Sequence, residues 1–197
     1  MQVYEKYWEI TNEFTDYNNV RFLTVLELCL DFIDTHQDEE YSDKLYTQLQ
    51  TKIQQHPVMI STRTGQPKNL ASVRKSINQL VKMGFIEPFL ASYTPLSREY
   101  IQARTNRKRQ TLLSKIVYTH SGFTRSVTEH SDIRQLNFLI KTLVEHPNGK
   151  LNKDEISALM LVDLANFPRD YLTEIELGNY LKQGLKSGFI ERKYNQI

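Results

Sequence analysis

The segment 69–88, NLASVRKSINQLVKMGFIEP, is the part of this 197-residue chain that decides the predicted fold. Val73, Ile77 and Leu80 recur at three- and four-residue spacing, which predicts a helix with one buried face. We predict that Gly84 ends this helix and that a short strand follows. The opposite face carries polar side chains that we expect to be exposed: Lys75, Asn78, Gln79 and Lys82. A helix, a glycine and a strand in this order are typical of the third helix and the wing of a winged helix-turn-helix.

The same pattern returns 104 residues later, in the segment 177–192, LGNYLKQGLKSGFIER. When the two segments are aligned on their glycines, six residues are identical: Gln79, Lys82, Gly84, Phe85, Ile86 and Glu87 match Gln183, Lys186, Gly188, Phe189, Ile190 and Glu191. The polar face of the second copy carries Asn179, Lys182, Gln183 and Lys186. Agreement on an exposed face does not follow from packing, so we predict two tandem copies of one unit.

The predicted fold class is mainly α with small β wings, arranged as two tandem winged helix-turn-helix domains. Residues 1–120 form the first domain, with an N-terminal extension and trailing linker helices, and residues 121–197 form the second. The first wing would use strands 85–90 and 92–95. The chain stops soon after the predicted strand that begins at Phe189, where a wing needs a return strand. We therefore expect the front part of a longer protein, or a shortened one.

The remaining segments fit this plan. An apolar helix is predicted for 19–35, and Cys29 within it is expected to be a small buried hydrophobe. A second helix is predicted to begin at Ser42 or Asp43 and to end before Pro57. Asn152 and Glu155 predict a capping box. Segment 4–15 is predicted to be extended, with Trp8 as a packing anchor.

The charge is distributed unevenly along the chain. Residues 1–56 hold 4 Lys/Arg against 11 Asp/Glu, residues 57–125 hold 12 against 2, and residues 126–197 hold 9 against 10. Residues 57–125 therefore form a basic block of net charge +10, which is the pattern expected for contact with a phosphate backbone. A solvated lysine-rich face is the alternative. The helix that the predicted fold presents to a partner carries Arg74, Lys75 and Lys82, and this favours nucleic acid as that partner.

Two segments concentrate the predicted phosphate contacts. The connector 58–68 leads to a helix N-terminus beside Lys68 and Asn69, which suits a phosphate oxygen. The run 104–109, RTNRKR, holds four basic residues among six. Such a run is typical of phosphate binding without sequence preference, or else of a solvated helix cap. The predicted backbone contacts are Arg63, Lys68, Asn69, Arg74, Arg104, Arg107, Lys108, Arg109 and Lys115. The two polar faces are the predicted base contacts, because Lys suits guanine edges whereas Asn and Gln suit adenine.

The order of these features resembles the N-terminal DNA-recognition region of type IIS restriction endonucleases of the FokI/AlwI kind and their nicking relatives. The matching features are Trp8, the long apolar helix, LVKMGFIEP followed by YTPLSREY, TNRKR, NFLIKTLVEHPNGKLNKDEISALML and LKQGLKSGFIE, which cover nearly the whole chain. The resemblance implies that tandem winged helices bind an asymmetric double-stranded DNA site as a monomer. It also implies a magnesium-dependent nuclease domain C-terminal to this segment, which itself would hold no cofactor.

A catalytic site is not predicted within the chain. Lys193 follows Glu191 by two residues and Asp170 could supply an upstream acid, but the segment between them is predicted to be helical. The five histidines lack ligand spacing, and a single cysteine provides no pair for zinc.

Two other classes of protein remain open. A tandem winged-helix transcription regulator or plasmid replication initiator would bind a repeated or inverted site as a dimer. A protein-binding winged-helix module would turn the basic block toward an acidic partner. A cytoplasmic location and no membrane contact are expected in each case, because the chain lacks a long apolar run and its start lacks a secretory pattern.

Overall fold

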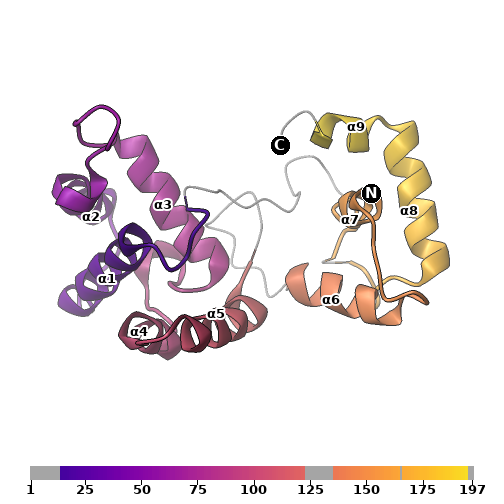
Figure 1. Ribbon diagram of the computed structural model, residues 1–197, viewed down its shortest axis with the longest axis horizontal. Coiled ribbons are helices and arrows are strands. Elements are labelled where there is room, and N and C mark those ends of the chain that lie inside the picture. Colours follow the sequence, from indigo (N-terminus) through magenta and orange to yellow (C-terminus); the bar gives the residue numbers. More distant parts are fainter. Residues whose placement is uncertain (1–13, 123–134, 165, 195–197) are drawn as a thin grey trace. The chain divides into compact units, whose positions relative to one another are not determined.

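The computed structural model describes residues 14–122, 135–164 and 166–194, which form two compact helical units (Figure 1). The first unit contains residues 14–122, and the second contains the described residues from 135 onward. The predicted boundary after residue 120 lies close to the start of the undescribed segment 123–134. Trp8 and most of the predicted extended segment 4–15 lie outside the described residues. The prediction of a mainly helical chain is confirmed.

The helices of the first unit follow the predicted order closely. The long apolar helix begins after its N-cap Asn19, and the second helix begins after Ser42 and ends before Pro57, as predicted. The elements are α1 (Val20–Thr35), α2 (Asp43–Gln55), the 3-10 turn η2 (Pro57–Met59), α3 (Leu70–Met83), the 3-10 turn η3 (Pro88–Leu90), α4 (Pro95–Gln102) and α5 (Asn106–His120).

The second unit is smaller. The predicted capping box forms, because the Asn152 side chain accepts from the backbone of Glu155 and the Glu155 carboxylate accepts from the backbone N–H of Asn152. In this unit α7 packs against α8, and α9 packs against both (Figure 1). The elements are α6 (Gln135–Glu145), α7 (Lys153–Leu159), α8 (Glu174–Lys186) and α9 (Phe189–Tyr194).

The helix register repeats between the two units with the same 104-residue offset as the sequence. Helices α2 and α7 end at Gln55 and Leu159, and helices α3 and α8 begin after the N-caps Asn69 and Thr173. The connection between the paired helices therefore spans residues 56–69 in the first unit and 160–173 in the second. Both connections are much longer than the turn of three or four residues in a typical helix-turn-helix.

The core of the first unit is built around α1. Phe22 is fully buried and makes edge-to-face contacts with Phe14 at 5.3 Å, Phe85 at 5.5 Å and Tyr100 at 6.2 Å between ring centroids. Such aromatic contacts add to the stabilisation from apolar burial. Cys29 is also fully buried, as predicted, and burial raises the pKa of its thiol to about 12.

At the position of the first predicted wing, the structure has a single antiparallel bridge, between Ile86 and Tyr93. Its ladder consists of the Glu87 N–H donating to Ser92 O at 2.8 Å and the Thr94 N–H donating to Phe85 O at 3.2 Å. The 3-10 turn η3 occupies part of the predicted strand 85–90. Two full wing strands are therefore not formed, because Pro88 has no N–H for a longer ladder.

The prediction of a wing strand beginning at Phe189 is wrong, because this segment forms helix α9. Gly184 on α8 leaves room for α9: a Cβ at that position would lie 2.9 Å from Ile190 Cδ1 and 3.2 Å from Leu161 Cδ1. Ile190, Phe189 and Leu161 are all buried in this small cluster. The chain therefore folds back onto α8 as a helix rather than continuing as a strand.

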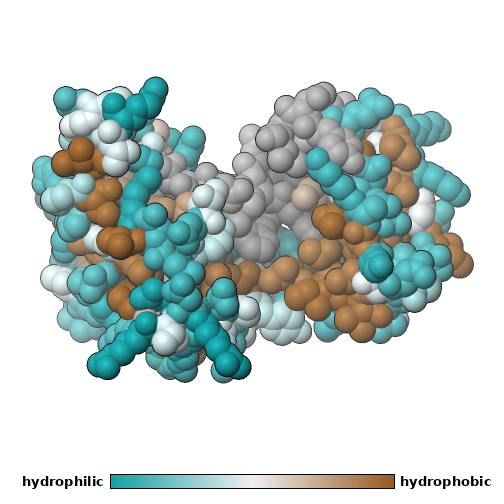
Figure 2. All heavy atoms as spheres, viewed as in Figure 1, coloured by the Kyte–Doolittle hydropathy of each residue, from teal (hydrophilic) through white to brown (hydrophobic). Residues whose placement is uncertain are grey.

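Helix α6 is amphipathic but only partly covered. Phe138 packs into the core of the second unit, whereas Ile140 and Val144 are exposed, and Figure 2 shows hydrophobic surface over this helix. Among the described helices, none is both long enough and apolar enough to cross a lipid bilayer.

Candidate nucleic-acid interface

Helix α3 is held with one face against the core. The Asn69 side chain accepts from the Ser72 N–H at 2.8 Å, and Gly84 ends the helix in the left-handed conformation, with φ of +84°. Val73, Ile77 and Leu80 are buried, as predicted. The local signals for this helix were therefore sufficient to define it.

The prediction that Gln79 and Lys82 lie on the exposed face of α3 is wrong. Gln79 is fully buried, and its amide forms two hydrogen bonds of 2.9 Å with the backbone N–H and C=O of Phe14. Lys82 is only 3% exposed, and its carbonyl accepts from the Gly122 N–H at 2.9 Å. Segments distant in the sequence cover the last turns of the helix, so neither residue remains a candidate base contact.

The exposed ridge of α3 lies one turn earlier than predicted. Arg74 and Lys75 are exposed, and Asn78 is half-buried at the end of the same ridge. Ala71 occupies its N-terminal end, so the spacing is i, i+3, i+4 and i+7. This ridge can present two cations and one amide to a partner.

Helix α8 presents all four polar residues predicted for it. Asn179, Lys182, Gln183 and Lys186 are exposed and follow the spacing i, i+3, i+4 and i+7, so they form one continuous ridge. The other face packs through Leu177 and Gly184. The ridge of α8 thus carries two amides and two cations on a rigid helix.

The N-terminus of α8 is closed by a capping box. Thr173 accepts from the Glu176 N–H, and the Glu176 carboxylate accepts from the Thr173 N–H at 2.9 Å and also pairs with Arg169. The backbone hydrogen bond from Thr173, followed by the Arg169 contact, lowers the pKa of Glu176. With Glu174 also in the first turn, this helix end repels a phosphate, so any contact with nucleic acid would involve the middle and C-terminal part of α8.

Helix α5 has the opposite charge at its start. Thr105 caps the helix by accepting from the Lys108 N–H at 3.2 Å, and its first turn contains no acidic residue. Arg104, Arg107 and Lys108 are exposed, and Lys115 is exposed two turns further along. Because a helix N-terminus carries partial positive charge, the added cations make this end a favourable place for a phosphate.

Arg109 differs from its neighbours. It is half-buried. Burial raises the pKa of the Tyr100 hydroxyl to about 12, and the positive charge of Arg109 nearby opposes this rise. Arg109 is therefore a weaker candidate for a backbone contact than Arg107 or Lys108.

The connector before α3 is an ordered hairpin rather than an open loop. A bridge joins Ile60 to Pro67, the Ser61 N–H donates to Gln66 O at 2.9 Å, and Gly65 takes the left-handed turn with φ of +66°. Arg63 is exposed near its tip, and Asn69 is exposed at its end. Lys68 is half-buried, with its backbone bonded to Met59 and Gln54.

The predicted backbone contacts form two groups in the first unit. Helices α3 and α5 approach one another near their C-terminal ends, where a Cβ on Gly84 would lie 2.5 Å from the His120 carbonyl carbon. Their N-terminal turns lie apart in Figure 1. Arg63, Lys68, Asn69 and Arg74 thus belong to one group, and the cations of α5 belong to the other.

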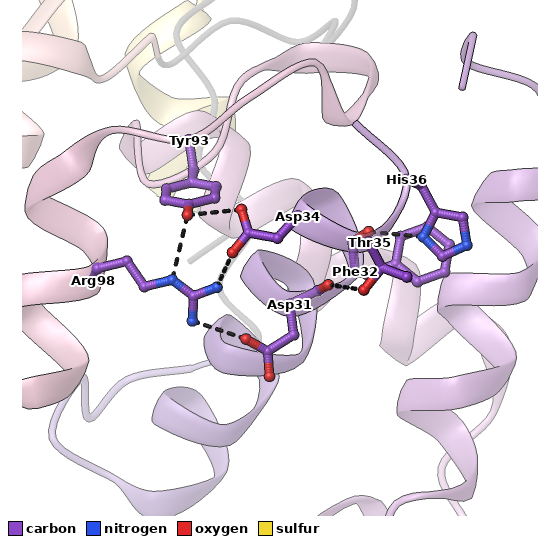
Figure 3. Close-up of polar contacts among 7 residues, drawn as sticks. All are labelled: Asp31, Phe32, Asp34, Thr35, His36, Tyr93 and Arg98. Atoms are coloured by element: carbon purple, nitrogen blue, oxygen red, sulfur yellow. Dashed lines mark hydrogen bonds and ion pairs between the residues drawn. The ribbon is translucent and has the colours of Figure 1, made fainter. Parts of the chain in front are cut away.

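Sequence patterns did not reveal an ion-pair network that ties α1 to Tyr93 and to α4 (Figure 3). Arg98 donates to Asp31 at 2.8 Å and also pairs with Asp34, and Tyr93 donates to Asp34 at 2.8 Å. The Tyr93 hydrogen bond lowers the pKa of Asp34, as does Arg98. The partners are 59 or more residues apart in the sequence, so no local spacing signals them.

The acids considered for catalysis are dispersed. Asp170 pairs with Lys141, which lowers the pKa of Asp170, and Glu191 is exposed on α9. Within residues 14–122, 135–164 and 166–194, no three His, Cys, Asp or Glu side chains gather in a way that could hold a metal ion.

Comparison with protein-family models, with curated proteins and with solved structures gave no match for this chain.

Proposed function

We propose that this chain binds double-stranded DNA sequence-specifically, as the target-recognition region of a type II restriction endonuclease of the IIS kind whose nuclease domain lies outside it. The observation that carries the proposal is the ridge of α8, where Asn179, Lys182, Gln183 and Lys186 are all exposed on one helix. Amide and amino groups at this spacing suit base edges in the major groove. The acid-free, cationic start of α5 supports contact with phosphates.

The proposed fold assignment is a pair of helix-turn-helix variants, in which the connections 56–69 and 160–173 replace the usual short turn. The first unit is a winged variant, with α2 and α3 as the helix pair and the Ile86–Tyr93 bridge as a reduced wing. The second unit keeps the pair α7 and α8 and replaces the wing with α9. Their common 104-residue register supports a shared origin of the two units.

The proposed contacts follow from side-chain chemistry and exposure. In the second unit the ridge of α8 contacts bases, and in the first unit Lys75 and Asn78 do so. Phosphate contacts come from cations and from the N-cap Asn69 of the first unit, of which all except the half-buried Lys68 are exposed: Arg63, Lys68, Asn69, Arg74, Arg104, Arg107, Lys108 and Lys115. The binding unit is a monomer on an asymmetric site.

The decisive experiment is selection of bound duplexes from a random pool, followed by binding of the selected duplex at several salt concentrations. The proposal expects one asymmetric consensus and a salt dependence that corresponds to several released counterions. Sedimentation of the complex should give one chain per duplex. A palindromic or repeated consensus bound by two chains would instead identify a regulator or replication initiator, and no salt-sensitive duplex binding would refute DNA binding.

A double variant and a charge-matched control test the proposed phosphate contacts of α5. Arg107→Ala with Lys108→Ala should weaken all duplexes about equally and reduce the salt slope by about 1.8, the value for two phosphate contacts. The matched control is Lys44→Ala with Lys52→Ala, which removes two exposed cations from α2 of the same unit. Equal losses in the two double variants would show that only net charge matters.

A further inference from the structure

A small aromatic pocket opens beside the C-terminal end of α1. It has a volume of about 210 Å³ and is lined by residues of α1, of the connection to α2 and of η3, including Phe32, His36, Glu39, Tyr41 and Phe89. Drug-sized ligand sites have volumes of roughly 300–1,000 Å³, so this one matches a single side chain.

The walls of the pocket are two pairs of rings. His36 stacks on Phe32 with centroids 4.0 Å apart (Figure 3), and Tyr41 meets Phe89 edge to face at 5.1 Å. Tyr41 is 40% exposed and Phe89 is 49% exposed. Exposed aromatic faces attract cations through the ring quadrupole, and arginine, tyrosine and phenylalanine are enriched in protein interfaces.

Two residues that line the pocket offer acceptor atoms. His36 Nδ1 lies 2.8 Å from Phe32 O, which can only accept, so Nδ1 carries the hydrogen and Nε2 is an acceptor in the neutral ring. His36 Nε2 lies 3.9 Å from a carboxylate oxygen of Glu39. A group with several N–H donors could serve both atoms at once.

The surroundings of the pocket are acidic. Residues 31–43 contain six Asp or Glu and no Lys or Arg, and none of the residues that line the pocket is Lys or Arg. This charge repels the phosphate backbone of nucleic acid and attracts a cation.

The same end of α1 already binds one arginine of the chain itself. Arg98 lies between Asp31 and Asp34, with its guanidinium carbon 5.4 Å from the centre of the Tyr93 ring (Figure 3). Carboxylates and an aromatic face therefore hold a guanidinium there. The pocket of Glu39, Tyr41 and Phe89 offers the same groups without a cation among its lining residues.

The backbone beneath Phe89 is strained. Phe89 has φ of 57° and Leu90 has φ of 55°, and both side chains are bulky. The left-handed region is unfavourable for bulky L residues, and strain of this kind is concentrated at functional sites. Here it holds the Phe89 ring beside Tyr41.

We infer that this pocket binds an arginine side chain of a basic partner polypeptide, with the guanidinium between the aromatic rings and donating to Glu39 and His36 Nε2. Arginine fits better than lysine because its planar group stacks on aromatic rings and reaches two acceptors together. This site is independent of the proposed DNA contacts, which lie on cationic parts of the chain.

The test is NMR titration of the full chain with a blocked glycine–arginine–glycine tripeptide and with its uncharged citrulline analogue. The arginine peptide should shift the amide signals of Glu39, Tyr41 and Phe89 saturably, with a dissociation constant on the order of 1 mM. The citrulline peptide should bind at least about tenfold more weakly. Equal binding of the two peptides, or no saturable shift at these residues, would overturn the inference.

Two variants make the test specific to the pocket. Glu39→Gln and Phe89→Gly should each weaken the arginine peptide by about fivefold or more. Glycine adopts φ of 57° without strain, so Phe89→Gly removes the ring while keeping the turn. The controls Glu27→Gln and Tyr118→Ala remove an exposed acid and an exposed aromatic ring elsewhere and should leave binding unchanged. Equal losses in the controls, or shifts of the same amides by a DNA duplex, would count against an arginine pocket.

Discussion

Helices α3 and α8 carry identical residues at two aligned positions, and the surroundings of these residues differ between the copies. Gln79 is fully buried and bonded to the backbone of Phe14, whereas its counterpart Gln183 is exposed. Lys82 is covered and Lys186 is exposed. The helices themselves are alike in start, length and spacing, so the difference comes from the segments that pack on them.

The segments after the two glycines also differ, for a local reason. In the first copy Glu87 precedes Pro88, and a residue before proline is disfavoured in the helical region. Its ψ is 155°, in the extended region. In the second copy Arg192 follows Glu191, and the chain continues as helix α9. The same four residues, GFIE, are thus followed by an extended turn before a bridge in one unit and form the start of a helix in the other, and the next residue differs.

The largest expected difference between the copies concerns their glycines. Gly84→Ala should destabilise the first unit by about 3 kcal/mol, because a Cβ there would meet the His120 backbone at 2.5 Å and φ is +84°. Gly188→Ala should cost only about 1 kcal/mol, because φ is +66° but no atom lies within 4 Å of the added Cβ. Amide hydrogen exchange in α1 and in α8 would report the stability of each unit. Equal losses would contradict the described packing of α5 on Gly84.

The next difference concerns the glutamines. Gln79→Ala should destabilise the first unit by roughly 2 kcal/mol, because it leaves the buried N–H and C=O of Phe14 without their partners. Gln183→Ala should change stability by less than about 0.5 kcal/mol, as is usual for an exposed position. Amide hydrogen exchange in α1 and in α8, measured at increasing urea concentrations, would check both values. A stable Gln79→Ala variant would mean that the segment at Phe14 does not depend on this amide.

A smaller effect is expected on DNA binding by the exposed ridge of α8. Lys182→Ala should lower affinity for the selected duplex by about tenfold, or about 1.4 kcal/mol, and relax the preference at one base pair. The control Lys150→Ala removes an exposed cation from the same unit and should change affinity much less. Competition between matched and mismatched duplexes measures the preference, and a loss that is the same for every duplex would assign Lys182 to the backbone instead.

The smallest expected effect is a pH dependence at the start of α8 that the start of α3 lacks. The pKa of Glu176 is lowered by its hydrogen bond from the Thr173 backbone, so its contribution is present above the unfolded-state pKa and is lost as pH falls through the lowered folded pKa. Because Glu176 is only half-buried, the loss should be under about 1 kcal/mol.

The N-cap of α3 is Asn69, whose side chain accepts from the Ser72 N–H, and the first turn of α3 has no acidic residue, so it should not respond in this way. Exchange rates at the two helix starts between about pH 5 and pH 3 would distinguish them. The control Glu176→Gln should abolish the dependence in α8, and a similar dependence in α3 would argue against the capping box as its source.

Local sequence signals predicted the helices well because each depends on nearby residues. The caps at Asn19, Ser42 and Asn152, and the left-handed Gly84, all lie where the sequence placed helix ends. The burial of Gln79 could not be predicted in this way, because it depends on Phe14, 65 residues away. Helix α9 could have been predicted, since the absence of a proline after Glu191 was visible in the sequence.

The candidate interface was predicted in part for the same reason. The four polar positions of α8 and the cations of α5 depend on helix periodicity alone, and they are exposed as expected apart from the half-buried Arg109. The Arg98 network and the pocket at Phe89 depend on contacts between distant segments and on an unusual backbone conformation, which residue spacing does not encode.

The single cysteine makes this chain well suited to spectroscopic labelling. Cys29 is fully buried, and a thiol with a pKa of about 12 holds almost no thiolate at neutral pH, so maleimide dyes and spin labels should leave it untouched in the folded protein. A cysteine introduced at an exposed position of each unit could then carry a probe without removal of the native one. Distances between such probes would reveal how the two units are arranged in solution, with and without a duplex.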